Sequence, residues 1–201
     1  MQVITKLLIP KHSRYFKYLL LPVAAVALVG CSTMTIISDY DPDTDKQLTG
    51  LQQSVDVFIS SMTSEIPKWD KQKRSAKNAY SAKKQFYNDF DEKLRLLEFR
   101  VQSIPKNSKT QKLVSDIRAS VLFDENDERR CEEENGGNGM ILKEGEETKL
   151  NSLQALHCLD KNKNEGPRRM ALEIAQRNIN QVVGAALALE VAKKQGTESN
   201  K

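Results

Sequence analysis

The chain has 201 residues, of which 31 are Lys or Arg and 27 are Asp or Glu, so its formal net charge is +4. This excess belongs to the first 30 residues, which hold four of the basic side chains and no acidic one. The other 171 residues therefore carry 27 charges of each sign, and their balance gives no argument for nucleic acid as a partner. They are enough for one domain with a hydrophobic core.

The first 30 residues have the three-part organisation of an export signal. An apolar run at 18–29, interrupted only by Pro22, is too short to cross a bilayer, which takes about 20 apolar residues. The last two residues of this run and the two that follow it, Leu28-Val29-Gly30-Cys31, resemble the lipobox of bacterial lipoprotein precursors. The basic residues that precede the run are Lys6, Lys11, Arg14 and Lys17.

The resemblance implies that residues 1–30 are a cleaved signal peptide and that Cys31 becomes the mature N-terminus. This cysteine would carry diacylglycerol and an N-linked acyl chain such as palmitate, and several chains on one residue anchor a protein durably. Ser32 replaces the aspartate that retains enteric lipoproteins at the inner membrane, so the resemblance implies the outer membrane of the cell envelope. A secretory leader that happens to end in cysteine, or an uncleaved anchor, is the alternative.

Residues 31–41 are expected to form the lipidated cysteine and a short tether, and residues 42–195 a helical bundle. Asp41-Pro42 predicts an N-cap followed by proline at the first helical position. Apolar residues then recur at alternating steps of three and four, which predicts one stripe of an amphipathic helix that ends at Pro67. The stripe consists of Leu48, Leu51, Val55, Phe58, Met62 and Ile66.

The same spacing predicts a second helix from Asp70 to Ile104, ended by Pro105. Ser108 and Gln111 suggest a capping box for a third helix that reaches Val121. Seven acids at 124–134 and the run Asn135-Gly136-Gly137-Asn138-Gly139 predict a loop.

Helix is expected to resume after Gly145, with leucines at 150, 153, 156 and 159. A last helix is predicted at 167–194, and residues 196–201 are expected to be a disordered tail. Apolar residues cover nearly every side of 182–189, so this segment should be the most buried part of the bundle or an oligomer contact. The predicted fold is an all-α bundle of four to five helices with short connections.

Two cysteines, Cys131 and Cys158, remain once Cys31 is assigned to lipid. An even pair in an oxidising compartment predicts a disulfide, which would close a loop of about 28 residues. The alternative is two free thiols too far apart to meet.

Residues that could carry chemistry are few. His157 is the single histidine after the leader, and a lone helical histidine is usually structural, so no catalytic residue is expected. Zinc bound by Cys131, His157 and Cys158 is disfavoured because adjacent helical residues point about 100° apart and no fourth ligand is evident. Calcium loops starting at Asp41 or Asp160 lack the glycine and glutamate that such loops need. We therefore expect no metal and no cofactor beyond the lipid.

The segment from Lys68 to Lys84 contains seven basic residues and one acid, Asp70, with Trp69 and Tyr80 between them. Such a face can contact anionic lipid headgroups or an acidic partner. The alternative is that this face and the acidic run at 124–134 are solvated surfaces that complement each other. The candidate contact residues are Lys68, Lys71, Lys73, Arg74 and Lys77.

These observations predict a membrane-anchored envelope lipoprotein that acts as a non-enzymatic interaction or structural module, in the periplasm or at the cell surface, with a protein partner. The alternative is a periplasmic lipoprotein that binds a small ligand or metal inside the bundle or under the disulfide-held loop. A pocket with convergent polar groups would favour the alternative, and an exposed apolar patch on the last helix would favour the interaction module.

Overall fold

The computed structural model describes residues 37–133, 139–141 and 152–198; Cys31, the leader and most of the helix expected after Gly145 lie outside these ranges. Within them the fold is all-α, as predicted, and its longest helices are α2 (Pro42–Ser64), α3 (Tyr80–Ser103), α4 (Ser108–Val121) and α8 (Arg169–Glu198). The shorter helices are η1 (Ala76–Asn78), α5 (Glu125–Glu133), α6 (Leu153–Cys158) and α7 (Asn162–Glu165).

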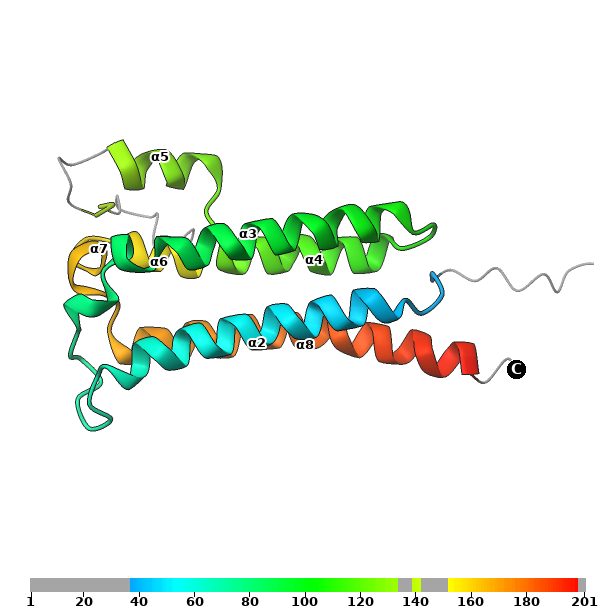
Figure 1. Cartoon of the computed structure of the whole chain (residues 1–201), viewed down its shortest axis with the longest axis horizontal. Helices are drawn as coiled ribbons and strands as arrows, with labels where there is room; N and C mark the ends of the chain where they lie inside the picture. Colours follow the sequence, from blue (N-terminus) through cyan, green and yellow to red (C-terminus); the bar gives the residue numbers. More distant parts are fainter. Residues whose placement is uncertain (1–36, 134–138, 142–151, 199–201) are drawn as a thin grey trace, which may run out of the picture. The chain divides into compact units, whose positions relative to one another are not determined.

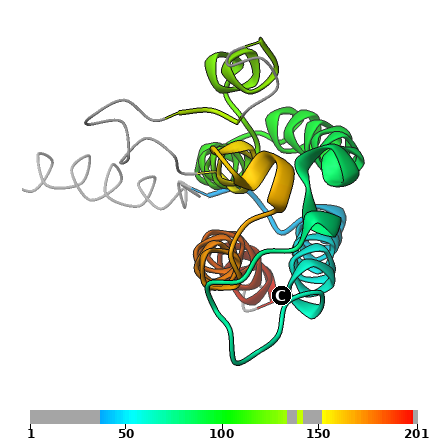
Figure 2. The same cartoon turned by 90° about the vertical axis from the view of Figure 1, so that its left-hand side faces the viewer.

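The four long helices form a closed ring in which α2 and α4 each pack against both α3 and α8 (Figure 2). Neighbours run antiparallel, because Arg100 near the end of α3 pairs with Asp41 at the start of α2, and Thr110 near the start of α4 bonds to Glu190 near the end of α8. This is an up-down-up-down four-helix bundle. We call the end at which α2 begins the proximal end and the end of the α2–α3 connection the distal end.

Helix α2 begins as predicted. Asp41 is its N-cap, with a carboxylate that accepts the Thr44 N–H at 3.1 Å, and Pro42 occupies the first helical position. The same carboxylate accepts two hydrogen bonds from Arg100 at 2.6 Å each, and these bonds hold the pKa of Asp41 well below its usual range. The cap therefore also fixes the end of α3 to the start of α2.

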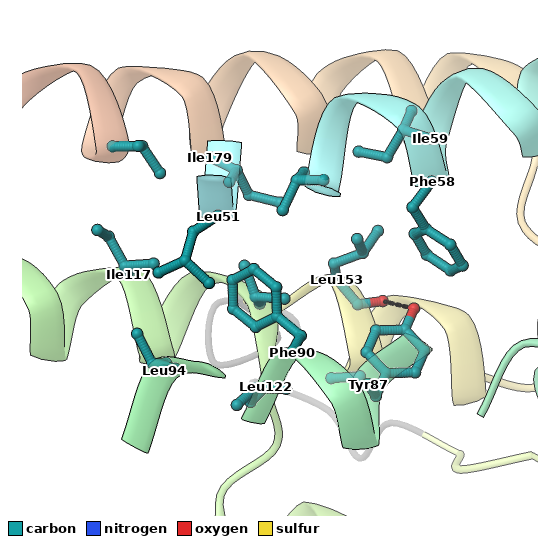
Figure 3. Packing of buried hydrophobic residues seen from close by; sticks show 14 of the residues in the cluster. Leu51, Phe58, Ile59, Tyr87, Phe90, Leu94, Ile117, Leu122, Leu153 and Ile179 are labelled. Carbon is teal, nitrogen blue, oxygen red and sulfur yellow. Dashed lines mark hydrogen bonds between the residues drawn. The ribbon is translucent and has the colours of Figure 1, made fainter. Parts of the chain in front are cut away.

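The core lies along the axis of this ring (Figure 3). Every residue of the stripe predicted for α2 is buried, and the corresponding stripe of α3 faces it. Phe58 stacks on Phe86 with ring centroids 3.7 Å apart, and Tyr87 meets Phe58 edge to face. The contributions of α4, α6 and α8 include Val114, Ile117, Leu153, Leu172, Ile179 and Val183.

The second helix starts later than the sequence pattern predicted. Residues 67–79 form turns and the short η1, and α3 begins at Tyr80 rather than near Asp70. The physical reason is that 70–79 contains no apolar side chain larger than alanine, so a helix there would have no face to bury. Asn78 instead uses its side-chain amide to donate to the Met62 carbonyl at 2.8 Å, which covers the end of α2.

The capping box expected for α4 is also absent. Its N-cap is Asn107, and Ser108 is already the first helical residue. The amide of Gln111 donates instead to the carbonyl of Val101 at 3.1 Å, which joins the ends of α3 and α4.

Two segments predicted to be irregular are helical. The acidic run expected in a loop contains α5, and α8 continues to Glu198 although a disordered tail was expected from 196. The hydroxyl of Thr197 donates to the Lys193 carbonyl at 2.9 Å within this last turn. Residues 199–201 lie outside the described ranges.

The apolar segment at 182–189 is only partly buried. Val183 and Ala186 face the core, whereas Ala185 and Ala188 are exposed. Only the side of this segment that carries Val183 and Ala186 is therefore buried. In the described ranges, none of the helices combines the length and apolar content that a membrane span requires.

Substitution of Gly166 tests how closely this glycine packs against the α2–α3 connection. Its φ is 75°, and a Cβ there would stand 2.6 Å from the Cβ of Asn78. Gly166→Ala should therefore lower the free energy of unfolding by about 1–3 kcal/mol. Gly184→Ala is the matched control, because no atom lies within 4 Å of its added methyl and alanine favours helix, so it should leave stability equal or slightly higher. Urea unfolding of both variants distinguishes these outcomes.

Candidate interaction surface at the distal end

The predicted cysteine pair is brought together. The sulfur atoms of Cys131 on α5 and Cys158 on α6 lie at disulfide distance, with Cα atoms 5.9 Å apart. The backbone beside the pair is also joined, since the Met140 N–H donates to the Cys158 carbonyl at 2.9 Å and the Asp160 N–H donates to the Met140 carbonyl at 2.8 Å. The bridge thus holds α5 against the bundle.

The five basic residues predicted to form one contact surface divide into two groups. Arg74 is mostly buried; its guanidinium bonds to the Asn162 side chain and donates to the Gly166 carbonyl at 3.0 Å. Lys77 pairs with Glu65 at 3.0 Å. Arg74 therefore serves the fold, whereas Lys77 stays exposed with its charge paired to Glu65.

Lys68, Lys71 and Lys73 are exposed. They belong to the connection between α2 and α3, whose path Figure 1 shows. Lys71 has one distant acidic neighbour, Glu173, at 3.9 Å. For Lys68 and Lys73, no acidic side chain of the described residues lies within ion-pair distance. Lys68 and Lys73 are thus exposed cations without an acidic neighbour in the described ranges, and their contact with a partner stays a prediction.

Trp69 stands among these lysines with 84 % of its surface exposed. The start of α8 adds two residues that the sequence pattern missed. Arg168 donates to the Gln72 side chain at 2.9 Å, and the N–H of half-exposed Met170 donates to the Lys71 carbonyl at 3.3 Å. We call the resulting patch the distal surface; it comprises Lys68, Trp69, Lys71, Lys73, Arg168 and Met170.

The distal surface combines an exposed aromatic ring with exposed cations. The carboxylate of Asp70, the acid within the loop, accepts the N–H groups of Gln72 and Lys73, so it is used locally. Among the described residues, the ion-pair partners of Lys71, Arg74 and Lys77 are Glu173, Glu165 and Glu65. Such a surface suits an anionic partner that also offers an apolar or flat group.

His157 lies fully buried in the core. Its Nε2 is 2.5 Å from the Asn78 carbonyl oxygen, which can only accept, so Nε2 carries the proton and Nδ1 accepts the Tyr87 hydroxyl at 2.9 Å. The rings of Tyr80, Tyr87 and Phe58 surround the imidazole. Burial lowers the pKa of His157 to about 4, and the bond to Asn78 offsets this only in part.

This pKa predicts a specific loss of stability in mild acid. The unfolded state binds a proton on His157 below pH 6.5, whereas the folded state does so only below about 4. Stability should therefore decline as pH falls through this window, by about 3 kcal/mol in all, with no further loss from this residue below it. Urea unfolding at several pH values tests the prediction, and His157→Gln should remove most of this slope; an unchanged slope would assign it to other groups.

The side chains of the two segments that begin like calcium loops, at Asp41 and Asp160, bond to other groups of the fold. Asp41 is occupied by Thr44 and Arg100, and the side chain of Asn162 bonds to the Leu156 carbonyl and to Arg74. Among the residues that the structure describes, no group of three or more His, Cys, Asp or Glu side chains is placed to hold a metal ion.

A hollow of about 440 Å³ lies between α3, α4 and α5, beside the helix that the disulfide holds. Its lining includes Arg118, which forms a bidentate pair with Glu98 at 2.7 and 2.8 Å and bonds Asp91 at 2.6 Å. These bonds raise the pKa of Arg118. Gln154, also in the lining, bonds to the Tyr80 hydroxyl and to the Phe123 N–H. Polar groups thus converge on the hollow, but Arg118 and Gln154 already have partners.

The proximal end contains a buried polar cluster that the sequence analysis did not find. Lys193 donates from Nζ to Asn107, Thr110 and Glu190 at 2.6–2.8 Å, and Ser38 donates to Asn107 at 2.8 Å. Glu190 is fully buried, and the second oxygen of its carboxylate has no hydrogen-bond partner among the described residues. The i, i+3 spacing of Glu190 and Lys193 was the available signal, but the pattern alone does not distinguish a buried pair from a surface one.

The fold and these sites define an antiparallel four-helix bundle with a disulfide-held side helix and a basic, tryptophan-bearing distal surface. No family model, curated protein or solved structure matches the chain.

Proposed function

We propose that this protein is an envelope lipoprotein, anchored by an acylated Cys31, whose bundle presents the distal surface to a partner with acidic groups. It acts by contact rather than by catalysis, and the outer membrane is the favoured location. The lipobox supports the anchor, and the exposed cations with Trp69 support the contact.

The observation that carries this proposal is the position of the surface relative to the start of the bundle. The chain joins the bundle at the proximal end, where Ser38 bonds to Lys106 and Asn107. The distal surface follows the far end of α2, a helix of 23 residues and therefore roughly 35 Å long. A membrane attachment before Ile37 thus leaves the free lysines and Trp69 at the end farther from the attachment.

Crosslinking in intact envelopes tests the contact. We expect the native chain to form an adduct that Lys68→Glu/Lys73→Glu abolishes, because the cations that attract the acidic partner are reversed. Lys46→Glu/Lys109→Glu is the matched control, since both lysines are exposed near the proximal end, and it should retain the adduct. The yield should also fall as salt is raised. Equal adducts from both double variants would remove the distal surface from the proposal.

The anchor has its own test. Intact-mass analysis of the mature protein should find an N-terminal Cys31 that carries diacylglycerol and an acyl chain. Cys31→Ala should abolish the lipid and reduce the adduct by removing the protein from the membrane. A mature chain that keeps its leader, or that lacks fatty acid, would contradict the proposed anchor.

The hollow beside α5 favours a second candidate function, the binding of a small polar ligand. This candidate is weaker because Arg118, the basic group most suited to an anionic ligand, already has two carboxylate partners. Calorimetry with candidate ligands, comparing the native chain with Arg95→Ala in the lining, would separate binding in the hollow from contact at the distal surface.

A further inference from the structure

Two large apolar side chains project from the last turns of α3. Phe99 is 76 % exposed and Leu96 is 65 % exposed, and their spacing of three residues puts them on one face of the helix. They lie at the proximal end, because the next residue, Arg100, pairs with Asp41 and Asp43 at the start of α2.

A membrane anchor on Cys31 would have to lie near these side chains, because little chain separates it from the proximal end. Ser38 is fixed to the turn between α3 and α4, since its N–H donates to the Lys106 carbonyl at 3.1 Å and its hydroxyl donates to Asn107 at 2.8 Å. Ser38 follows Cys31 by seven positions in the chain, a stretch that spans at most about 25 Å when fully extended. An acylated Cys31 would therefore keep the proximal end close to the bilayer.

We infer that Leu96 and Phe99 enter the boundary between headgroups and acyl chains of the bilayer that holds the anchor. The inference rests on the proposed function, and it adds an orientation, with the proximal end against the membrane. The depth is suitable, because Phe99 and Leu96 lie four and seven residues before Ser103, or about 6 and 10 Å along the helix. Interfacial helices bury their apolar side about 5–10 Å.

A bilayer fits this pair of side chains better than a second copy of the chain. A stable protein interface buries about 800 Å² on each partner, whereas one aromatic side chain buries only about 150–250 Å². Charged or polar residues flank the pair on α3, among them Glu92, Arg95 and Gln102. Two side chains are sufficient at a membrane, because the acylated cysteine supplies the attachment and their role is to orient the bundle.

Tryptophan reporters on the full-length protein test the inference. Trp69 is the single tryptophan, so Trp69→Phe gives a silent background for Phe99→Trp. Val57→Trp in the same background is the matched control, because Val57 is 70 % exposed but lies toward the middle of the bundle. Each protein is reconstituted into vesicles of phosphatidylethanolamine and phosphatidylglycerol with brominated acyl chains, and vesicle flotation is measured with tryptophan fluorescence.

We expect the native protein and both reporter variants to float with the vesicles. The fluorescence of a tryptophan at position 99 should be quenched by bromine and shifted to the blue, whereas that of Trp69 in the native protein and of a tryptophan at position 57 should not change. Flotation without quenching at position 99 would overturn the inference and leave the anchor intact, as would a crosslink between two copies at that position. Equal quenching at all three positions would overturn the end-on orientation. Failure to float would overturn both the anchor and this inference.

Discussion

Lys193→Met should lower the free energy of unfolding by about 3–5 kcal/mol. The ammonium group of Lys193 is the charged partner of Glu190, and neither side chain is exposed to solvent. Without it, Glu190 remains a buried carboxylate, and its remaining hydrogen bond within the described ranges comes from the Thr110 hydroxyl at 3.0 Å. Urea unfolding at neutral pH, followed by circular dichroism, measures the loss.

The companion variant Glu190→Leu/Lys193→Met separates the cost of an unpaired charge from the value of the pair. Replacing both partners with apolar residues leaves no charge to desolvate, so the double variant should recover most of the stability. A double variant as unstable as the single one would mean that the bonds from Lys193 to Asn107 and Thr110 carry the effect.

Cys131→Ala/Cys158→Ala should lower stability by about 3.5 kcal/mol, the value expected for removing a cross-link that closes a loop of this length. Both side chains are fully buried, so the alanines leave only small cavities and the main effect is on the unfolded chain. Unfolding of the native protein with and without reductant measures the same contribution independently.

Reductant should leave the double alanine variant unchanged, which makes it the control for other effects of the reagent. If reductant has no effect on the native protein, the two thiols are not bridged in solution. Proteolysis near α5 should also accelerate after reduction, because the disulfide is the cross-link that holds α5 to α6 of the bundle.

The sequence predicted those features that depend on neighbouring residues. The stripe of α2, its Asp41 cap and the end of α3 before Pro105 each follow from spacing or from a single residue type. The cysteine pairing followed from counting. The start of α3 was predicted wrongly at Asp70, although the lack of an apolar stripe in residues 70–79 pointed to a later start.

The remaining features depend on contacts between distant segments. Helix α5 has no apolar stripe, and its attachment depends on Cys131, whose partner lies 27 residues away. Similarly, the lysines of the distal surface were evident in the sequence, but Arg168 and Met170 join them only because α8 begins beside the α2–α3 connection. Local spacing could not predict these neighbours. It also could not predict that Arg74 would be mostly buried, with its guanidinium bonded to the Gly166 carbonyl.

The closed ring of helices also constrains when the chain can fold. Helix α2 is the first of the four to be synthesised and α8 the last, yet α8 is one of the two neighbours that cover the apolar stripe of α2. A nascent chain that lacks α8 leaves part of this stripe in water, so the native core cannot close during synthesis. The order of the helices thus keeps the native core open until the last helix is made, which would suit the export that we propose for this chain.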